Sequence, residues 1–274
     1  MSRIHARSGV RAAALGVALA TATGAAFAQN YPTRPVQVIV PYSAGGSIDI
    51  MTRAVAQQLD KQWGQNVVID NRAGASGMIG TELVSRAKPD GYMLLGNTSS
   101  FPATVSVRAK LPFDPVKSIV PVPTFAKAPM LVAVHNSVKA TSIKELIELA
   151  KQRELTYGSS GVGGNNHFSG SLFAAAAGVK MTHVPYKGIA PAVTSLSGGE
   201  IDLIISSAAA LGPAMEAKRV RILGVTGYHG MKSMPEVPTL RESGVDMGGL
   251  DANQWFGIAA PAGTPDYVVT RINA

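Results

Sequence analysis

The sequence contains no cysteine, which excludes disulfides, thiol nucleophiles, thiolate metal sites and a lipidated N-terminal cysteine. Aromatic residues are scarce, at 6% of the chain, and the basic residues form no run. Nucleic-acid-binding proteins usually gather Lys and Arg on one surface, with aromatic side chains beside them. The composition therefore argues against a nucleic-acid partner.

After the N-terminal segment, the sequence contains no long apolar run. Residues 1–28 themselves have the three parts of a secretory signal peptide. These parts are a basic start with three arginines, the apolar core Ala12–Ala20 and the cleavage sequence Ala26-Phe27-Ala28. The core is too short to span a bilayer comfortably, so we expect cleavage after Ala28. This would leave 246 residues (274 less 28) with a net charge of about +5, from 22 basic and 17 acidic residues. A cysteine-free chain with this leader is expected in the bacterial periplasm.

The rest of the chain alternates strand-like and helix-like segments, beginning with the stretch Val40–Arg53. A buried strand ends at Pro41, Ala44-Gly45-Gly46 forms a loop without bulky side chains, and Ser47 is predicted to cap a helix. A strand, a glycine loop and a helix N-terminus together present free N–H groups to an anion. An ordinary βα turn explains the same residues equally well.

Several later segments follow the same alternation, which predicts parallel, doubly wound sheets. A helix is predicted with Ile79, Leu83 and Ala87 on one face, and a polar loop holding Thr98 follows the next strand. Such loops at strand ends usually contact ligands in open α/β sheets. Residues 110–129 contain five prolines and are interpreted as a loose connection.

The second half of the chain contains the glycine-rich loop 158–167 and a strand, residues 201–205, with Asp202 inside it and Ser206 at its end. Val40-Pro41-Tyr42 and Val184-Pro185-Tyr186 form a weak internal echo, which suggests two lobes that each offer a helix N-terminus to a shared cleft. We expect lobe 1 to comprise residues 29–129 and 253–274, and lobe 2 residues 130–252. The last predicted helix runs to Ala274 without a cap, so the chain is expected to lack a C-terminal segment.

Motifs for common chemistries are missing. The sequence has no phosphate-binding P-loop, no complete dinucleotide-binding glycine pattern and no nucleophile elbow, and its histidines lack metal-ligand spacing. A triad of Ser160, His167 and Asp202 can be drawn, but such trios arise by chance in a chain of this size. We therefore expect no catalytic residue, no metal site and no cofactor.

Five motifs, taken together, resemble the Bug-type extracytoplasmic solute receptors of tripartite tricarboxylate transporters. They run in order along the chain from about Tyr31: Pro41-Tyr42-x-Ala44-Gly45-Gly46-x-x-Asp49, Tyr157-Gly158-Ser159-Ser160-Gly161-x-Gly163 with His167, Val184-Pro185-Tyr186-Lys187-Gly188, Pro235-x-Val237-Pro238-Thr239-Leu240-x-Glu242-x-Gly244, and Trp255-x-Gly257 through Pro261-Ala262-Gly263-Thr264-Pro265. The chain departs from the family at Tyr42, where Phe is more usual, and in the family's final helical segment.

The resemblance implies a periplasmic binding protein-like type II fold, with two α/β lobes and a ligand cleft between them. It implies that loop backbone groups and water hold a small carboxylate, which is delivered to membrane permease subunits, and we expect a monomer. Together with the strand-end residues, the expected ligand-binding set is Tyr42, Ala44, Gly45, Gly46, Asp49, Thr98, Ser159, Ser160, Gly163, His167, Tyr186, Lys187, Asp202 and Ser206.

Four residues of this set have a plainer interpretation. Asp49 can simply stabilise its helix N-terminus, and His167 can cap its own loop. Lys187 can be solvated, and Asp202 needs a buried partner if it lies away from the cleft. Two other functions also fit the sequence: a ligand sensor for a signalling partner, and a periplasmic hydrolase using Ser160 or Ser206. Which carboxylate is bound is left open among citrate-like acids, dicarboxylates, acidic amino acids and aromatic acids.

Overall fold

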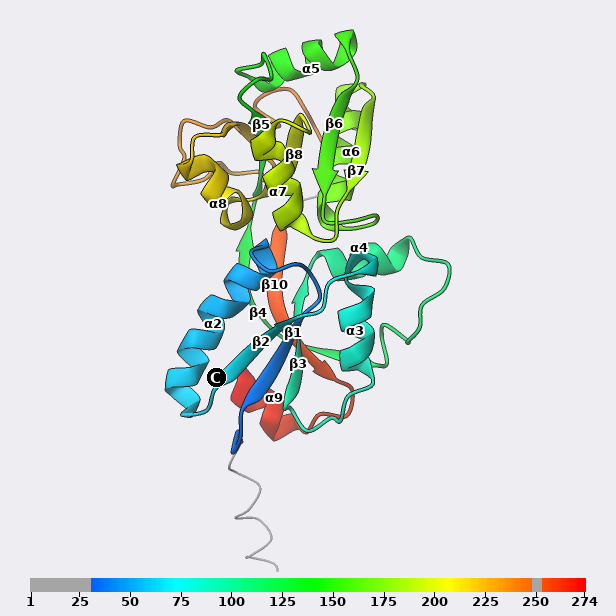
Figure 1. Ribbon diagram of the computed structural model, residues 1–274, viewed down its shortest axis with the longest axis vertical. Helices are drawn as coiled ribbons and strands as arrows, with labels where there is room; N and C mark the ends of the chain where they lie inside the picture. The colour runs from blue at the N-terminus through cyan, green and yellow to red at the C-terminus, as the bar shows by residue number, and fades with distance from the viewer. Residues whose placement is uncertain (1–30, 248–252) are drawn as a thin grey trace, which may run out of the picture.

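The computed structural model describes residues 31–247 and 253–274. The predicted signal peptide and its cleavage site lie outside these ranges. Figure 1 shows two lobes, one above the other, each built around a five-stranded sheet covered by helices. Lobe 1 contains β1 to β4 and β10, and lobe 2 contains β5 to β9, which confirms the predicted two-lobed α/β fold.

The described residues form the following helices and strands, in chain order. They are β1 (Val36–Val40), α2 (Ser47–Trp63), β2 (Val67–Asn71), η2 (Ala75–Gly77), α3 (Met78–Ser85), β3 (Met93–Thr98), α4 (Ser100–Ser106), β4 (Ile119–Ala128), β5 (Met130–His135), α5 (Ile143–Gln152), β6 (Leu155–Ser159), α6 (Asn165–Ala177), β7 (Met181–Pro185), α7 (Ile189–Gly198), β8 (Leu203–Ser207), α8 (Ala208–Glu216), β9 (Val220–Val225), β10 (Gln254–Pro261) and α9 (Asp266–Asn273).

The two sheets have the same plan. Their strand orders are β2-β1-β3-β10-β4 and β7-β6-β8-β5-β9. In each sheet the first three strands are parallel, and the fourth is antiparallel to both of its neighbours. The counterpart of β1 is therefore β6. The similar segments Val40–Tyr42 and Val184–Tyr186 do not occupy equivalent places in the two lobes. Val40 ends β1, whereas Val184 lies on β7, whose counterpart is β2.

Apolar side chains are buried on both faces of the lobe 2 sheet. On β5, Met130, Val132 and Val134 pack into one core, while Leu131 and Ala133 pack into the other. A strand covered on both faces is expected to be apolar throughout, as this one is.

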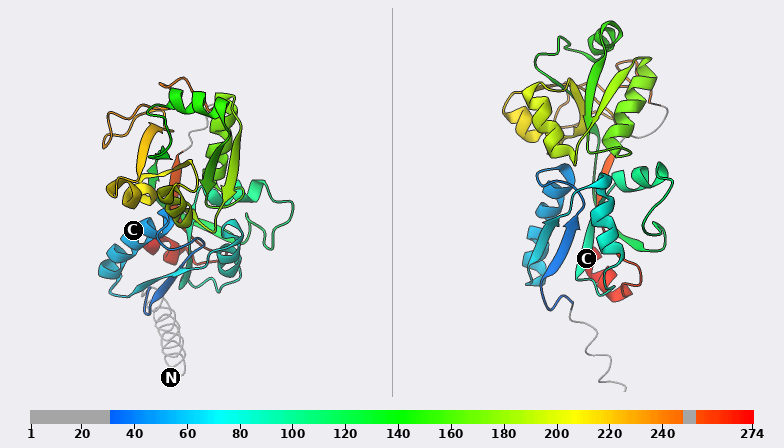
Figure 2. Two further views of the ribbon diagram at one scale, coloured as in Figure 1. Left: turned by 45° about the horizontal axis from the view of Figure 1, so that its top comes forward. Right: turned by 45° about the vertical axis from the view of Figure 1, so that its right-hand side comes forward.

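Two strands connect the lobes (Figure 2). β4 leads directly into β5 of lobe 2, and β10 re-enters lobe 1 beside it, with Gln254 opposite Ala128 and Pro261 opposite Ile119. The loose connection expected over residues 110–129 is wrong in its second half, where β4 lies. Among the described residues, no helix is long and apolar enough to cross a bilayer.

Two local expectations are corrected. Ser47 is not the N-cap of α2: Gly46 occupies that position, and Ser47 is the first helical residue. The face of α3 that carries Ile79 and Leu83 points outward, since these side chains are 54% and 42% exposed. By contrast, Ser142 caps α5 by accepting a hydrogen bond from the Glu145 backbone N–H.

Candidate functional site

The loop between β1 and α2 brings a helix N-terminus to the lobe boundary. β1 is almost wholly buried, and Gly45 has φ +76, a conformation that favours glycine. Gly46 is extended and provides no side-chain cap, so the first turn of α2 keeps free N–H groups. Figure 1 shows this end of α2 directed at lobe 2.

Asp49 holds this loop from within. Its carboxylate accepts hydrogen bonds from the Gly45 N–H (2.9 Å), Arg53 Nε (3.0 Å) and Asn71 Nδ2 (2.9 Å). Burial raises the pKa of Asp49, but these three donors outweigh it and leave the pKa below its ordinary value. The oxygens of Asp49 are thus occupied by groups of the protein, and its bond to the Gly45 N–H holds the glycine loop.

Lobe 2 presents the equivalent arrangement after β6. Gly164, like Gly46, is an extended N-cap without a side-chain cap, and it begins α6. Ser160 Oγ donates to Asn166 Oδ1 (3.0 Å), and Asn166 Nδ2 donates to the carbonyl of Ile205 (2.8 Å). The first turn of α6 is thereby fixed to β8. The two lobes present matching helix N-termini.

Within the described part of the chain, four hydrogen bonds join the lobes across this boundary. Ser207 Oγ donates to Ser47 Oγ (2.8 Å), and Ser76 Oγ donates to the carbonyl of Val162 (2.8 Å). The Asn165 N–H donates to Ser100 Oγ (3.1 Å), and Thr104 Oγ1 donates to the carbonyl of Gly163 (3.3 Å). The cleft between the lobes is therefore closed.

A cavity of about 20 Å³ remains inside the closed cleft, which is room for about one water molecule. Its walls come from both lobes and include the first turns of α2, α6 and α7. The residues that line it are Tyr42, Gly46, Ser47, Ile48, Thr98, Ser100, Ser160, Asn166, Ile189 and Gln254. None of these side chains is charged at neutral pH. Burial raises the pKa of Tyr42 to about 12, so its hydroxyl stays a neutral donor.

Several buried oxygens at this boundary lack a hydrogen-bond partner among the described residues. Thr98 Oγ1 and Gln254 Oε1 belong to residues that line the cavity, and Ser206 Oγ lies next to Ser207 at the end of β8. Buried polar atoms are normally satisfied by protein or by water. A cluster of unsatisfied atoms at a cavity points to a polar guest.

The structure brings most of the expected residues together. Tyr42, Gly46, Thr98 and Ser160 line the cavity. The others do not line it: Ala44, Gly45, Ser159, Gly163, Tyr186 and Ser206 lie in adjoining loops and strand ends, and His167 lies in the first turn of α6. Lys187 is exposed. Sequence reasoning missed six lining residues: Ser47, Ile48, Ser100, Asn166, Ile189 and Gln254. All six stand in the first two positions of a helix or of a crossing strand, a place that could have signalled them.

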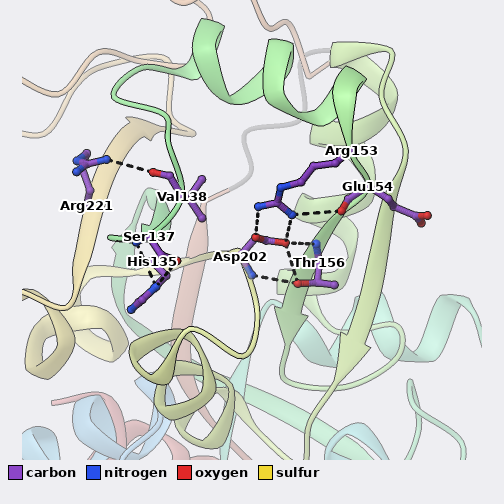
Figure 3. A network of polar contacts seen from close by, with 8 residues as sticks. All are labelled: His135, Ser137, Val138, Arg153, Glu154, Thr156, Asp202 and Arg221. Carbon is purple, nitrogen blue, oxygen red and sulfur yellow. Dashed lines mark hydrogen bonds and ion pairs between the residues drawn. The ribbon is translucent and has the colours of Figure 1, made fainter.

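Asp202 is not brought to this group. It precedes β8, whose other end reaches Ser47, so about five residues of strand, or roughly 16 Å, separate it from the boundary. Figure 3 shows its carboxylate held by Arg153 Nη2 (2.6 Å) and Nη1 (3.1 Å), and by the N–H (2.8 Å) and Oγ1 (3.1 Å) of Thr156. Asp202 thus joins β8 to β6 inside lobe 2.

Replacing Asp202 with Asn is expected to lower the free energy of unfolding by about 1–2 kcal/mol, because charged hydrogen bonds are lost and Arg153 is half exposed. Ligand affinity should stay within about twofold. Urea unfolding and calorimetric titration measure the two effects. The matched control is Glu148→Gln, which removes an ion pair with Lys151 whose side chains are both more than half exposed. A large loss of affinity in Asp202→Asn would contradict this structural role.

Two histidines stack at the cleft end of lobe 2. The rings of His167 and His183 lie 3.9 Å apart, and the Gly163 N–H donates to His167 Nδ1 (3.1 Å), which therefore carries no proton. Desolvation lowers the pKa of His167, and it lowers the pKa of His183 to about 4 with a further contribution from His167. Ser159 Oγ lies 2.6 Å from His183 Nε2, but this serine is wholly buried and also bonds to Gly161. The pair lacks the access that an attacking serine needs.

We expect the stability of the protein to fall as the pH is lowered from about 6.5 to about 4. In the unfolded chain His183 binds a proton near pH 6.5, whereas in the folded protein its pKa is lowered to about 4. The pKa of His167 is lowered as well, which acts in the same direction. The pKa values of Asp49 and Asp202 are also lowered in the folded protein. Their contribution to stability is lost only below about pH 3.8, outside the range in which the histidines act. In His183→Gln, the free energy of unfolding should differ less between about pH 7 and pH 4.5 than it does in the wild type. Denaturant unfolding at the two pH values measures it. The exposed His229→Gln should leave it unchanged. An equal slope in both variants would contradict the prediction.

Among the described residues, no three His, Asp or Glu side chains are placed to hold a metal ion. The polar groups that line the cavity are hydroxyls, side-chain amides and the backbone of helix N-termini.

The chain is similar in sequence and in structure to known proteins. The model of the family "Tripartite tricarboxylate transporter family receptor" matches residues 51–274. Protein BugT of Bordetella pertussis is 34% identical over 267 residues, covering 95% of this chain and 81% of that protein. A structure described as R. palustris Rpa4515 with adipate is 38% identical with a TM-score of 0.85, covering 89% of this chain and 82% of that chain. MatC from Rhodopseudomonas palustris with bound malate is 28% identical with a TM-score of 0.83, covering 89% and 83%. The chain therefore belongs to the receptor family of the tripartite tricarboxylate transporters.

Proposed function

We propose that this chain is a periplasmic receptor that captures a small carboxylate between its lobes and delivers it to the permease subunits of a tripartite tricarboxylate-type transporter. One observation carries the proposal: the N-termini of α2, α6 and α7 meet from both lobes at a cavity without charged side chains. Helix N-termini favour anions through their free N–H groups and their dipole.

The magnitudes are sufficient for useful affinity. A hydrogen bond to a charged group contributes about 1.5–3 kcal/mol, and a helix N-terminus adds about 0.3–1 kcal/mol. Three or four such bonds approach the roughly 8 kcal/mol of micromolar binding, against which the entropy of association acts. Closure of the lobes strengthens each bond by excluding water. A cavity of about 20 Å³ cannot admit an organic acid, so the ligand enters when the lobes part.

The relatives support the class of ligand, since one is described with adipate and another with malate. We propose that Tyr42, Gly46, Thr98 and Ser160 contact the ligand, together with Ser47, Ser100 and Asn166. We propose that the loop residues beside them (Ala44, Gly45, Ser159, Gly163, His167, Tyr186 and Ser206) shape the cleft. The chain acts in this proposal as a monomer without enzymatic activity, released into the periplasm by cleavage after Ala28.

A hydrolase is the weaker alternative, because the hydroxyls of Ser159 and Ser206 are inaccessible and Ser160 Oγ is paired with Asn166. His167 and Asp202, the partners drawn for Ser160 in the sequence, lie in separate networks.

A thermal-shift screen of the protein against small carboxylates and uncharged analogues tests the proposal. Binding to the folded state alone adds about 2.7 kcal/mol of stability when the ligand is at a hundredfold excess over its dissociation constant. We expect at least one acid to raise the unfolding midpoint and to survive incubation unchanged. Shifts by uncharged compounds alone, or turnover of the ligand, would overturn the proposal.

A further inference from the structure

The loop between β2 and α3 has a strained backbone. Gly74, Ala75, Ser76 and Gly77 all have positive φ, at +138°, +47°, +55° and +90°. Glycine adopts such angles readily, but the Cβ atom of alanine or serine opposes them. Within the described part of the chain, Lys218 is the one other non-glycine residue with a positive φ. A conformation of this kind persists only where surrounding contacts hold it.

Contacts from both lobes hold this segment, which we call the 74–77 loop. Arg108 Nη2 donates to the carbonyl of Ala75 (2.8 Å), and the Tyr42 hydroxyl donates to the carbonyl of Ser76 (3.3 Å). Both of these donors belong to lobe 1. The Ser76 hydroxyl crosses the boundary and donates to the carbonyl of Val162 in lobe 2 (2.8 Å). Ser76 is therefore bonded to its own lobe through its carbonyl and to the other lobe through its side chain.

The packing around Ser76 is as close as its hydrogen bonding. A Cβ atom at Gly77 would lie 2.9 Å from the Tyr42 ring, and one at Gly161 of lobe 2 would lie 2.6 Å from Ser76 Oγ. The two glycines thus leave the room that this close approach needs. Tyr42 lines the interlobe cavity. A continuous line of contacts therefore runs from the cavity through Tyr42 and Ser76 to lobe 2.

The Ser76–Val162 bond differs in position from two of the other described bonds between the lobes. Ser47 and Ser100, which accept hydrogen bonds from lobe 2, both line the cavity. The cavity has room for about one water molecule, so a larger ligand separates these two serines from lobe 2. Neither Ser76 nor Val162 lines it, so their bond can remain beside a bound ligand. The fourth bond also lies outside the cavity but is longer, at 3.3 Å against 2.8 Å.

We propose that Ser76 is a positioning residue: its hydrogen bond to Val162 holds the lobes together around a bound ligand and sets how long the ligand stays. This bond forms only once the lobes meet, so it has no part in the first encounter of the ligand with the open cleft. It has to break before the lobes part, so it slows release. The inference rests on the proposed function, since it presumes that an acid is bound between the lobes.

Stopped-flow binding kinetics of the full chain with adipate and malate test the inference. Ser76→Ala removes the hydroxyl but keeps the carbonyl that accepts from Tyr42. It should raise the dissociation rate constant of the bound acid about fivefold, as expected for the loss of one hydrogen bond, and leave the association rate constant within about twofold. Ser106→Ala is the matched control, because Ser106 Oγ donates over the same 2.8 Å to the carbonyl of Ala103 within lobe 1. It should leave both rate constants unchanged.

Ser76→Gly distinguishes this role from a general effect on stability. Glycine accepts the positive φ, so this variant should unfold at a higher temperature than Ser76→Ala. Both variants lack the hydroxyl, so both should release the acid equally fast. A role confined to folding would instead make the release rate follow the unfolding midpoint.

The closure of the lobes can be measured directly, because the chain contains no cysteine. Spin labels at Lys61→Cys in lobe 1 and Lys151→Cys in lobe 2, both exposed, are then the only labels in the molecule. Double electron–electron resonance between them gives the ratio of closed to open molecules. Without ligand, this ratio should be about fivefold lower in Ser76→Ala than with Ser76 in place.

The outcomes separate the inference from the proposed function. If the wild type binds neither adipate nor malate, and no acid in the thermal-shift screen, the proposed function fails and the inference falls with it. If an acid binds but Ser76→Ala changes neither its release nor the ratio of closed to open molecules, the inference alone is overturned. The same holds if Ser106→Ala speeds release as much as Ser76→Ala does.

Discussion

Gly188→Ala is expected to weaken ligand binding by about tenfold to a hundredfold. Gly188 precedes α7 in lobe 2 with φ +137, and a Cβ atom built there would lie 2.9 Å from the backbone nitrogen of Ser43 in lobe 1 and closer still to the Ser43 hydroxyl. Overpacking of this kind destabilises the packed state by about 1–3 kcal/mol, and about 1.4 kcal/mol corresponds to tenfold in affinity. The clash exists only when the lobes close, so it opposes the closed, ligand-bound form.

Gly178→Ala provides the control for this experiment. Gly178 ends α6 in lobe 2 with φ +65, and a Cβ atom there would meet nothing within 4 Å. Both variants carry the conformational strain of a positive φ, but only Gly188→Ala obstructs the partner lobe. Calorimetry measures the affinity, and small-angle X-ray scattering measures closure with the ligand. Equal affinity and equal closure in the two variants would contradict the argument.

Asp49→Ala should lower the free energy of unfolding by about 3 kcal/mol or more and weaken ligand binding as well. The change removes three hydrogen bonds to a charged group, each worth about 1.5–3 kcal/mol before allowance for the half-exposed Arg53. It leaves the Gly45 N–H without this acceptor and the Asn71 amide with only the Tyr42 carbonyl to donate to (3.1 Å), and the loop that presents the α2 N-terminus loses its internal support. Urea unfolding and calorimetry measure the two effects.

Arg53→Met isolates the exposed part of this network. Arg53 is 47% exposed in its side chain, so its removal should destabilise by less than about 1 kcal/mol and leave binding nearly unchanged. If Asp49→Ala were no more harmful than Arg53→Met, the carboxylate would not be the support of the glycine loop.

Sequence patterns predicted the β1–loop–α2 unit and the two-lobed α/β fold, because buried strands, glycines and helix starts leave local signals. They placed Ile79 and Leu83 on a common face but gave no sign that it points outward. The reason is tertiary: a Cβ atom at Gly80 would lie 2.9 Å from Pro41, so α3 packs closely through the face that holds Gly80 and Val84, and Ile79 and Leu83 lie on the opposite, outward face. Packing of this kind overrides an amphipathic pattern.

Proline misled the interpretation of β4. Pro121 and Pro123 lack a backbone donor and suggest a break, yet β4 is an edge strand that pairs with β10 alone, where a missing donor is tolerated. Gln254 was missed for a different reason. Its position at the start of a strand is the one local signal, and its place at the cavity follows only from the pairing of β10 with β3 and β4.

The way one lobe is inserted into the other has a consequence for biosynthesis. All five strands of lobe 2 come from residues 130–225, a continuous stretch that can complete its sheet as soon as it is made. Lobe 1 cannot do so, because β4 has no neighbour until residues 254–261 arrive and fill the gap beside β3. An unpaired strand edge is exposed to aggregation during that interval. During synthesis, lobe 2 can therefore complete its sheet before lobe 1 does. Chaperones that bind exposed strand edges should act on lobe 1.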